Sequence, residues 1–148
     1  MEFAYKITVF TPAYNRAHTL EKLYRSLQRQ TFQNFEWLIV DDGSTDGTEK
    51  LVNKWQAEEN PFPVRYVWQE NGGKCRAVNH GLELAAGEMF FTVDSDDYLL
   101  HDALENAARW ESELPQNGKF CAVSGNLGTA PGKTPNAPLP GPYYDGTA

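Results

Sequence analysis

Short apolar runs alternate along the chain with segments in which apolar residues recur every three or four positions. Runs rich in β-branched and aromatic residues predict strands, and the 3.6-residue spacing predicts amphipathic helices. The predicted strands cover 6–11, 35–40, 64–68, 89–93 and 120–124. The predicted helices run through 20–27, 51–55, 74–86 and 103–113, with Cys75, Val78 and Leu82 on one face of the third.

Single residues refine the expected ends of these elements. Pro12 is expected to end the first strand, because proline cannot donate a hydrogen bond to a strand ladder. Thr19 is a candidate N-cap of the first helix. Asp46 and Glu49 have the spacing of a capping box at the start of the second. Gly87 lies where the C-terminal glycine of the third helix is expected.

The strict alternation of strand and helix predicts an α/β fold with a mostly parallel, Rossmann-like sheet flanked by helices. In such sheets ligands bind outside the carboxyl ends of the strands. Polar residues gather at four of those predicted ends, in segments 11–16, 41–46, 71–76 and 94–97. The pattern therefore predicts one functional rim rather than four unrelated helix caps.

The most informative cluster contains three carboxylates, Asp94, Asp96 and Asp97, directly after the buried run 89–93. Carboxylates this close repel one another unless a cation lies among them or water solvates them. An Asp-x-Asp at a strand end is a candidate site for a hard divalent ion shared with a phosphate-bearing substrate. The alternative is an acidic turn that caps the next helix, and the three other polar clusters favour the site.

The remaining rim residues suit a nucleotide ligand. Asp41 has a carboxylate that can accept hydrogen bonds from a base N–H or a ribose hydroxyl; the alternative is an Asx-turn. Thr11 and Tyr14 offer hydroxyl, ring and main-chain contacts to a base. Arg16 and Lys74 can neutralise phosphate, although single cations of this kind are commonly surface charges.

Composition narrows the classes of partner. The 148-residue chain is 41% apolar and carries a net charge of −7, which disfavours a nucleic-acid backbone or an anionic membrane as partner. It has no membrane-spanning run and no signal-peptide pattern, so a cytoplasmic location is expected, with peripheral membrane association left open. Five prolines lie within 129–148. We therefore expect a domain over 1–127 and an irregular tail over 128–148, and a natural protein that continues beyond this chain.

Four motifs, in order, resemble family 2 glycosyltransferases with the GT-A fold: Val-Phe-Thr-Pro-Ala-Tyr-Asn-Arg (9–16), Leu-Ile-Val-Asp-Asp-Gly-Ser-Thr-Asp-Gly-Thr (38–48), Asn-Gly-Gly-Lys (71–74) and Asp-Ser-Asp-Asp (94–97). The resemblance covers about 6–124. It implies a nucleotide-sugar donor, with a UDP-sugar expected, and a role in polysaccharide biosynthesis. By this resemblance Thr11, Pro12, Tyr14 and Arg16 line the nucleotide pocket, Asp41 contacts the base, Ser95 lies near the ribose or phosphates, and Asp94 and Asp96 bind Mg²⁺ or Mn²⁺ on the donor diphosphate.

The resemblance also implies an inverting displacement with a carboxylate as general base. In this family that base belongs to an acceptor-binding half that follows the fifth strand. Here only the proline-rich stretch and Asp145 follow. We do not assign the base to Asp145, and expect it to lie outside the chain, which would then be the N-terminal, donor-binding portion of an enzyme. The acceptor, an unidentified saccharide or lipid-linked molecule, and the oligomeric state are not predicted.

Two alternatives remain at this point. The chain is a non-catalytic module that binds a nucleotide-sugar, or it is a phosphatase that resembles the haloacid dehalogenases, which also carry an Asp-x-Asp after an apolar strand. The second alternative expects the motif on the first strand, with Thr or Val two residues after the second Asp. Here the motif follows the fourth predicted strand, and Tyr98 holds that position.

Overall fold

A parallel four-stranded sheet organises the part of the chain that the computed structural model describes, residues 2–114. Its strands are β1 (Tyr5–Ala13), β2 (Phe35–Asp41), β3 (Val64–Trp68) and β4 (Gly87–Thr92), in the spatial order β3-β2-β1-β4. The predicted strand 120–124, the domain end at 127 and the tail 128–148 lie outside the described residues.

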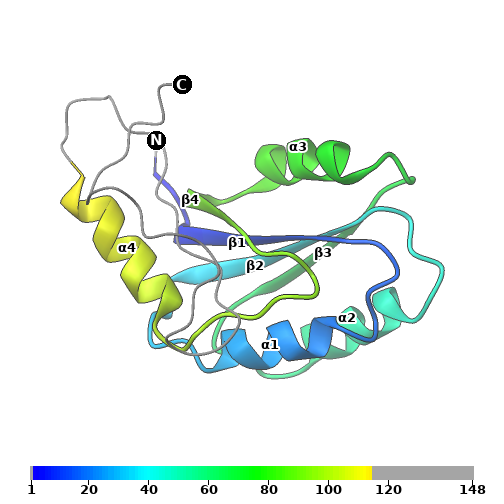
Figure 1. Ribbon diagram of the computed structural model, residues 1–148, viewed down its shortest axis with the longest axis horizontal. Helices are drawn as coiled ribbons and strands as arrows, with labels where there is room; N and C mark the ends of the chain where they lie inside the picture. Colours follow the sequence, from blue (N-terminus) through cyan, green and yellow to red (C-terminus); the bar gives the residue numbers. More distant parts are fainter. Residues whose placement is uncertain (1, 115–148) are drawn as a thin grey trace, which may run out of the picture. The chain divides into compact units, whose positions relative to one another are not determined.

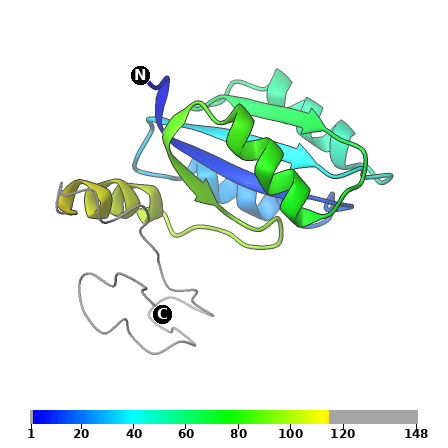
Figure 2. The same cartoon turned by 90° about the horizontal axis from the view of Figure 1, so that it is seen from above.

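Four helices accompany the sheet: α1 (Leu20–Gln28), α2 (Thr48–Ala57), α3 (Lys74–Leu84) and α4 (Ala103–Glu113). Helices α1 and α2 cover one face of the sheet and α3 covers the other (Figures 1 and 2). Residues up to Leu104 form one compact unit, and a second begins at Glu105, within α4. The arrangement confirms the predicted α/β fold. Within residues 2–114 no helix is long and apolar enough to cross a membrane.

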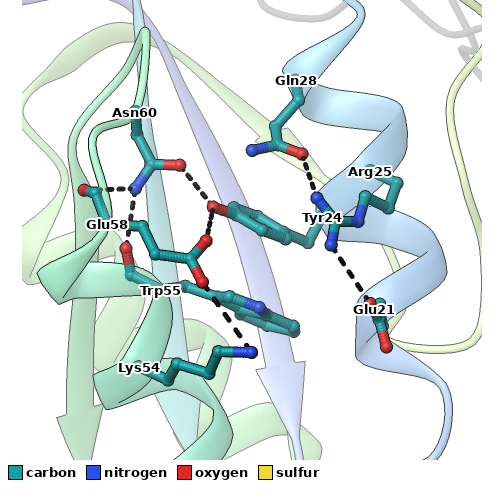
Figure 3. Close-up of polar contacts among 8 residues, drawn as sticks. All are labelled: Glu21, Tyr24, Arg25, Gln28, Lys54, Trp55, Glu58 and Asn60. Atoms are coloured by element: carbon teal, nitrogen blue, oxygen red, sulfur yellow. Dashed lines mark hydrogen bonds and ion pairs between the residues drawn. The ribbon is translucent and has the colours of Figure 1, made fainter.

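Aromatic stacking forms the core between the sheet and helices α1 and α2. The Tyr24 ring lies 4.4 Å from Trp55 and 6.0 Å from Trp37, measured between ring centroids. The Tyr24 hydroxyl lies 2.5 Å from the Asn60 amide oxygen and 3.0 Å from the Glu58 carboxylate (Figure 3). Burial and the neighbouring Glu58 raise the Tyr24 pKa above its ordinary value. These contacts join α1 to the end of α2 and fix the helical layer against β2.

The opposite face of the sheet packs against α3 through small residues. The buried positions of α3 are Ala77 and Gly81, and Val78 is partly buried. The prediction that Cys75 and Leu82 share the buried face is wrong, since Cys75 is exposed and Leu82 is 53% exposed. Small side chains allow the helix to approach the sheet closely, and periodicity of large apolar residues does not detect such a face.

Gly87 does not end helix α3, as predicted, but starts β4. Its N–H donates to the Thr8 hydroxyl (2.8 Å), and a Cβ at this position would lie 2.3 Å from the backbone nitrogen of Thr8. The glycine is therefore required by the close approach of β4 to β1, and α3 ends earlier, at Leu84.

Pro12 does not end β1 either, because the strand continues through it to Ala13. The β1–β4 ladder stops where Phe10 pairs with Thr92, whereas the β1–β2 ladder continues to Ala13. Phe10 accepts a hydrogen bond from Val93 on the β4 side, and alternation along a strand places the nitrogen of Pro12 on that same side. Since no ladder bond is needed there, proline is tolerated.

Candidate functional site

The carboxyl ends of all four described strands lie at one edge of the sheet, because the strands are parallel and in register. Ala13 pairs with Asp41, Asp41 pairs with Trp68, and Phe10 pairs with Thr92. The polar segments that follow these strands are therefore brought to a common rim, as the sequence predicts. We refer to the segments 13–17, 41–48, 69–76 and 93–98 as the rim loops.

The first two rim loops are joined by side-chain to backbone hydrogen bonds. Asn15 has φ of +53°, a conformation that asparagine tolerates better than most residues. Its N–H donates to the Ser44 hydroxyl (2.8 Å), and its side-chain oxygen accepts from the N–H of Thr45 (2.9 Å). The Ala17 N–H donates to the Asp46 carboxylate (3.2 Å). Asn15 therefore acts as a structural link that sequence reasoning missed.

Asp46 caps α2, but not through the predicted capping box. Its carboxylate accepts from the N–H of Thr48 (2.9 Å), while its own N–H donates to Asn15 (3.3 Å) instead of Glu49. The helix N-cap position is held by Gly47. Burial acts to raise the pKa of Asp46, but hydrogen bonds from Thr48 and the Ala17 amide hold that pKa below its ordinary value.

Arg16, a predicted phosphate ligand, lies half-buried at the turn before α1. Its N–H donates to the Thr48 hydroxyl (3.0 Å), and its carbonyl accepts from the Thr19 hydroxyl (3.3 Å). Thr19 holds the predicted N-cap position, but its hydroxyl donates backward instead of accepting from the helix. Main-chain contacts therefore fix Arg16 at the rim, and a phosphate contact of its side chain stays a prediction.

Asp41, the predicted base ligand, is completely buried at the end of β2. Its Oδ1 accepts from the Ser44 N–H (2.7 Å) and its Oδ2 accepts from the Tyr66 hydroxyl (2.6 Å). Burial and the Asp41 carboxylate raise the pKa of Tyr66 well above its ordinary value. A carboxylate can accept about four hydrogen bonds, but in this conformation a ligand reaches Asp41 only if the loop that bears Ser44 moves.

The β1 residues expected in the nucleotide pocket divide into buried and exposed groups. The Thr11 side chain is completely buried, and its hydroxyl accepts from the Trp37 indole N–H (3.0 Å). A nucleotide contact by Thr11 is therefore restricted to its main chain. Pro12 is half-buried beside Val40 in the ladder, and Tyr14 is 50% exposed at the rim. Of these residues, Tyr14 has the side chain that is most accessible to a ligand.

The acidic motif forms a turn after β4 and meets the predicted phosphate cation. The N–H of Asp97 donates to the Asp94 carbonyl (3.1 Å), and the Lys74 Nζ lies 2.6 Å from the Asp94 Oδ1. Ser95 is buried, whereas Asp96 is exposed. Burial, followed by the charges of Asp96 and Asp94, raises the pKa of Asp97. The structure thus brings together Lys74 and the carboxylates predicted to meet the donor diphosphate.

These carboxylates suit a hard divalent ion that is shared with a ligand. Within residues 2–114 no three His, Cys, Asp or Glu side chains converge on a common point. Mg²⁺ is commonly held by one or two carboxylates, substrate phosphates and water rather than by a complete protein cage. Mutual repulsion among the acids of the turn, seen in the raised pKa of Asp97, is relieved by a cation. Asp94 and Asp96 therefore fit a site that a donor phosphate completes.

The family described as Glycosyl transferase family 2 matches residues 8–122 of the chain. The chain belongs to family 2 of the glycosyltransferases. This assignment confirms the resemblance found in the four motifs. It also disfavours the phosphatase alternative, as does the position of the acidic turn after β4, the fourth strand.

Curated relatives of this family 2 chain include the glycosyltransferase GlyG of Streptococcus pneumoniae, which is 38% identical over 67% of the chain. A Campylobacter jejuni relative, named GalNAc(5)-diNAcBac-PP-undecaprenol β-1,3-glucosyltransferase, is 34% identical over 73% of the chain. The aligned regions cover 33% and 35% of these two proteins. The chain thus spans about a third of the length of the relatives named here.

Solved structures of glycosyltransferases share the fold. Staphylococcus aureus TarS (1–349), in complex with UDP-GlcNAc, aligns with a TM-score of 0.67 and 35% identity, covering 73% of this chain and 31% of that one. The mannosyltransferase PcManGT of Pyrobaculum calidifontis, in complex with GDP-Man and Mn²⁺, aligns with a TM-score of 0.69 and 30% identity, covering 75% and 33%. The family 2 chain therefore has the GT-A fold.

Sequence reasoning also left one rim carboxylate without a role. Asp42 is 5% exposed and accepts hydrogen bonds from the side chain of Gln69 and from the N–H groups of Gly72 and Gly73. Burial acts to raise the pKa of Asp42, but these hydrogen bonds and the nearby charge of Arg76 hold it below its ordinary value. The adjacent acids Asp-Asp at 41–42 were the signal available in the sequence, but their partners were not.

Proposed function

We propose that this chain binds a nucleotide-sugar donor at the rim loops, and that it forms the donor-binding part of an inverting glycosyltransferase. The observation that carries the proposal is the contact of Lys74 with Asp94 (2.6 Å) at the acidic turn. A diphosphate and its metal ion require a cation and hard oxygen ligands side by side. The exposed Lys74 and Asp94 provide both at the end of β4.

The structural relatives support the class of donor. TarS is described with UDP-GlcNAc and PcManGT with GDP-Man and Mn²⁺. We favour a UDP-sugar as the donor of this chain and Mg²⁺ or Mn²⁺ as the ion. In this proposal Asp94 and Asp96 hold the ion, Lys74 and Arg16 meet phosphate, and Ser95 lies near the ribose or phosphates. Tyr14, Asp41, Pro12 and the main chain of Thr11 enclose the nucleoside.

The chemistry required of these residues is stabilisation of a leaving group. As the bond between sugar and nucleoside diphosphate breaks, negative charge develops on the diphosphate. A bound divalent ion supplies electrostatic stabilisation of that charge. Lys74 adds a second positive charge from the protein. The acceptor, a saccharide or a lipid-linked saccharide, then attacks from the opposite side with a general base. No residue among 2–114 is assigned as that base.

The proposal is tested by titration calorimetry of UDP into the 148-residue chain, first with Mn²⁺ and then with EDTA. We expect binding with Mn²⁺ and its loss with EDTA. Asp96→Ala is expected to abolish the metal-dependent part. Glu59→Ala, an exposed acid in the α2–β3 connection, is the control and is expected to bind as the unmodified chain does. Metal-independent binding that Asp96→Ala leaves unchanged would refute the metal site.

A different base is distinguished in the same experiment. If UDP fails to bind and GDP or dTDP binds with Mn²⁺, the donor class holds and the base is corrected. If none of the three nucleotides binds in either condition, the donor-binding proposal is wrong for this chain.

A further inference from the structure

We propose that Asp42 and Gln69 are positioning residues for the donor diphosphate, because they fix the loop that sets Lys74 beside Asp94. Neither residue is expected to touch the donor. The inference rests on the proposed function, in which Lys74 and Asp94 face the donor phosphates. It assigns a role to the second acid of the 41–42 pair, which the proposed site does not use.

Asp42 binds the β3–α3 loop with both oxygens of its carboxylate. Oδ1 accepts from the Gln69 Nε2 (2.7 Å) and the Gly72 N–H (2.9 Å), and Oδ2 accepts from the Gly73 N–H (2.7 Å). Its main-chain carbonyl also accepts from the Asn71 side chain (2.9 Å). Hydrogen bonds to an ionised, buried acceptor are among the stronger ones in proteins. This carboxylate therefore holds the loop at two consecutive amides.

The held amides immediately precede Lys74. Gly73 has φ of +89°, and its carbonyl accepts from the N–H groups of Arg76 (3.1 Å) and Ala77 (3.2 Å), which form the first turn of α3. Gly73 is thus fixed to Asp42 on one side and to the helix on the other. The position of the Lys74 backbone, and the direction in which its side chain leaves the helix, follow from these contacts.

The ion pair between Lys74 and Asp94 does not fix itself. The two side chains are 60% and 45% exposed. Exposed ion pairs of this kind contribute little free energy, because water and salt screen them and long side chains lose entropy when they are held. The short distance between Lys74 Nζ and Asp94 Oδ1 therefore depends on the backbone at the start of α3. Asp42 supplies that constraint from β2.

Gln69 orients the Asp42 carboxylate, and the chemistry of its partners fixes the direction of every hydrogen bond. A carboxylate only accepts, so the Gln69 Nε2 donates to Asp42 and the Gln69 Oε1 remains to accept from the His80 Nδ1 (2.9 Å). The Nδ1–H is present in one neutral tautomer of His80 and in its protonated form. Protonation of His80 therefore leaves this chain of hydrogen bonds intact.

The test compares two substitutions that make the same chemical change. Asp42→Asn converts the buried carboxylate to an amide, and Glu70→Gln does the same at an exposed residue nearby. UDP with Mn²⁺ is titrated by calorimetry into each variant of the 148-residue chain, and uridine is titrated by ligand-observed NMR. We expect Asp42→Asn to weaken UDP binding about tenfold, of the order of one lost hydrogen bond to a charged group. Uridine binding is expected to be unchanged, and Glu70→Gln is expected to alter neither ligand.

A double-mutant cycle separates positioning from general damage. If Asp42 acts through Lys74, Asp42→Asn has little further effect on UDP affinity once Lys74→Ala is present. Gln69→Leu, which keeps an apolar chain but removes the donor to Asp42, is a second variant. Circular dichroism confirms that each variant is folded, and if Asp42→Asn does not fold, Gln69→Leu replaces it in the cycle.

Several results would overturn the inference while leaving the proposed function in place. These are unchanged UDP affinity in both Asp42→Asn and Gln69→Leu, equal losses for UDP and uridine, or additive effects of Asp42→Asn and Lys74→Ala. Failure of the unmodified chain to bind UDP, GDP or dTDP would instead refute the proposed function and, with it, the role in donor binding. The two failures are therefore distinguishable.

Discussion

Gly81→Ala tests how closely α3 lies against the sheet. A Cβ built at Gly81 lies 2.3 Å from Cε2, 2.5 Å from Cδ2 and 3.0 Å from Cζ of the Phe10 ring. Non-bonded carbon atoms pack at about 3.5–4.0 Å, so the overlap with the nearest ring atom exceeds an ångström. The ring cannot move aside, because Phe90 stacks on it at 4.9 Å and Leu38, Val40 and Ala77 surround it.

Two opposing effects determine the change in stability. Replacing glycine by alanine within a helix favours folding by about 1 kcal/mol. Overpacking a well-filled core costs about 1–3 kcal/mol, and the overlap with three atoms of Phe10 indicates the upper end of that range. We therefore expect Gly81→Ala to lower the free energy of unfolding by about 1–2 kcal/mol, even though it introduces a better helix former.

The assay is urea denaturation followed by tryptophan fluorescence and by circular dichroism. Glu83→Ala, at an exposed position of the same helix, is the control, and its effect is expected to stay within about 0.5 kcal/mol. Because the clash with Phe10 displaces α3 outward, Lys74 at its start shifts relative to Asp94. UDP affinity is therefore expected to fall as well. A Gly81→Ala variant as stable as the unmodified chain, or more stable, would refute this account of the α3 face.

Three further predictions concern the rim carboxylates and Thr11. Replacing Tyr66 by Phe removes a 2.6 Å hydrogen bond to the buried Asp41, so a loss of about 1–3 kcal/mol in thermal or urea unfolding is expected, and no change would contradict it. Thr11→Val leaves the buried indole N–H of Trp37 without its acceptor, so stability is expected to fall by a similar amount, about 1–3 kcal/mol, with UDP affinity unchanged in calorimetry. Because the folded-state pKa of Asp42 is depressed, its stabilisation is present above the unfolded-state pKa and is lost as pH falls through the folded-state value. The stability difference between the unmodified chain and Asp42→Asn, measured by urea titration at several pH values, is therefore expected to shrink in acid; a difference that grows there would contradict it.

Local patterns in the sequence predicted the elements whose form depends on their own residues. The strand at 64–68 and the helix at 103–113 were predicted with the bounds that the structure shows. Errors occurred where a neighbouring element decides the outcome. Gly87 was interpreted as a helix terminator, but its role follows from the backbone of Thr8, 79 positions earlier in the chain. No pattern around residue 87 contains that information.

The site shows the same division. The sequence predicted that Lys74 and Asp94 belong to one rim, because parallel strands bring their carboxyl ends together, and the structure places their charged atoms in contact. It did not predict the role of Asp42, whose partners Gly72 and Gly73 lie 30 and 31 positions away. Such contacts depend on strand order and register, which a single sequence does not specify.

Burial separates the rim acids into two kinds with different capacities. A buried carboxylate must receive hydrogen bonds from the protein, since an unpaired one is expensive to remove from water. Asp41 and Asp42 meet that requirement with donors from their own loops, and so hold structure. Asp94 and Asp96 keep access to solvent, and their charges help to raise the pKa of Asp97. A cation is therefore bound most favourably at the acidic turn, and the buried pair at the end of β2 determines how precisely Lys74 meets it.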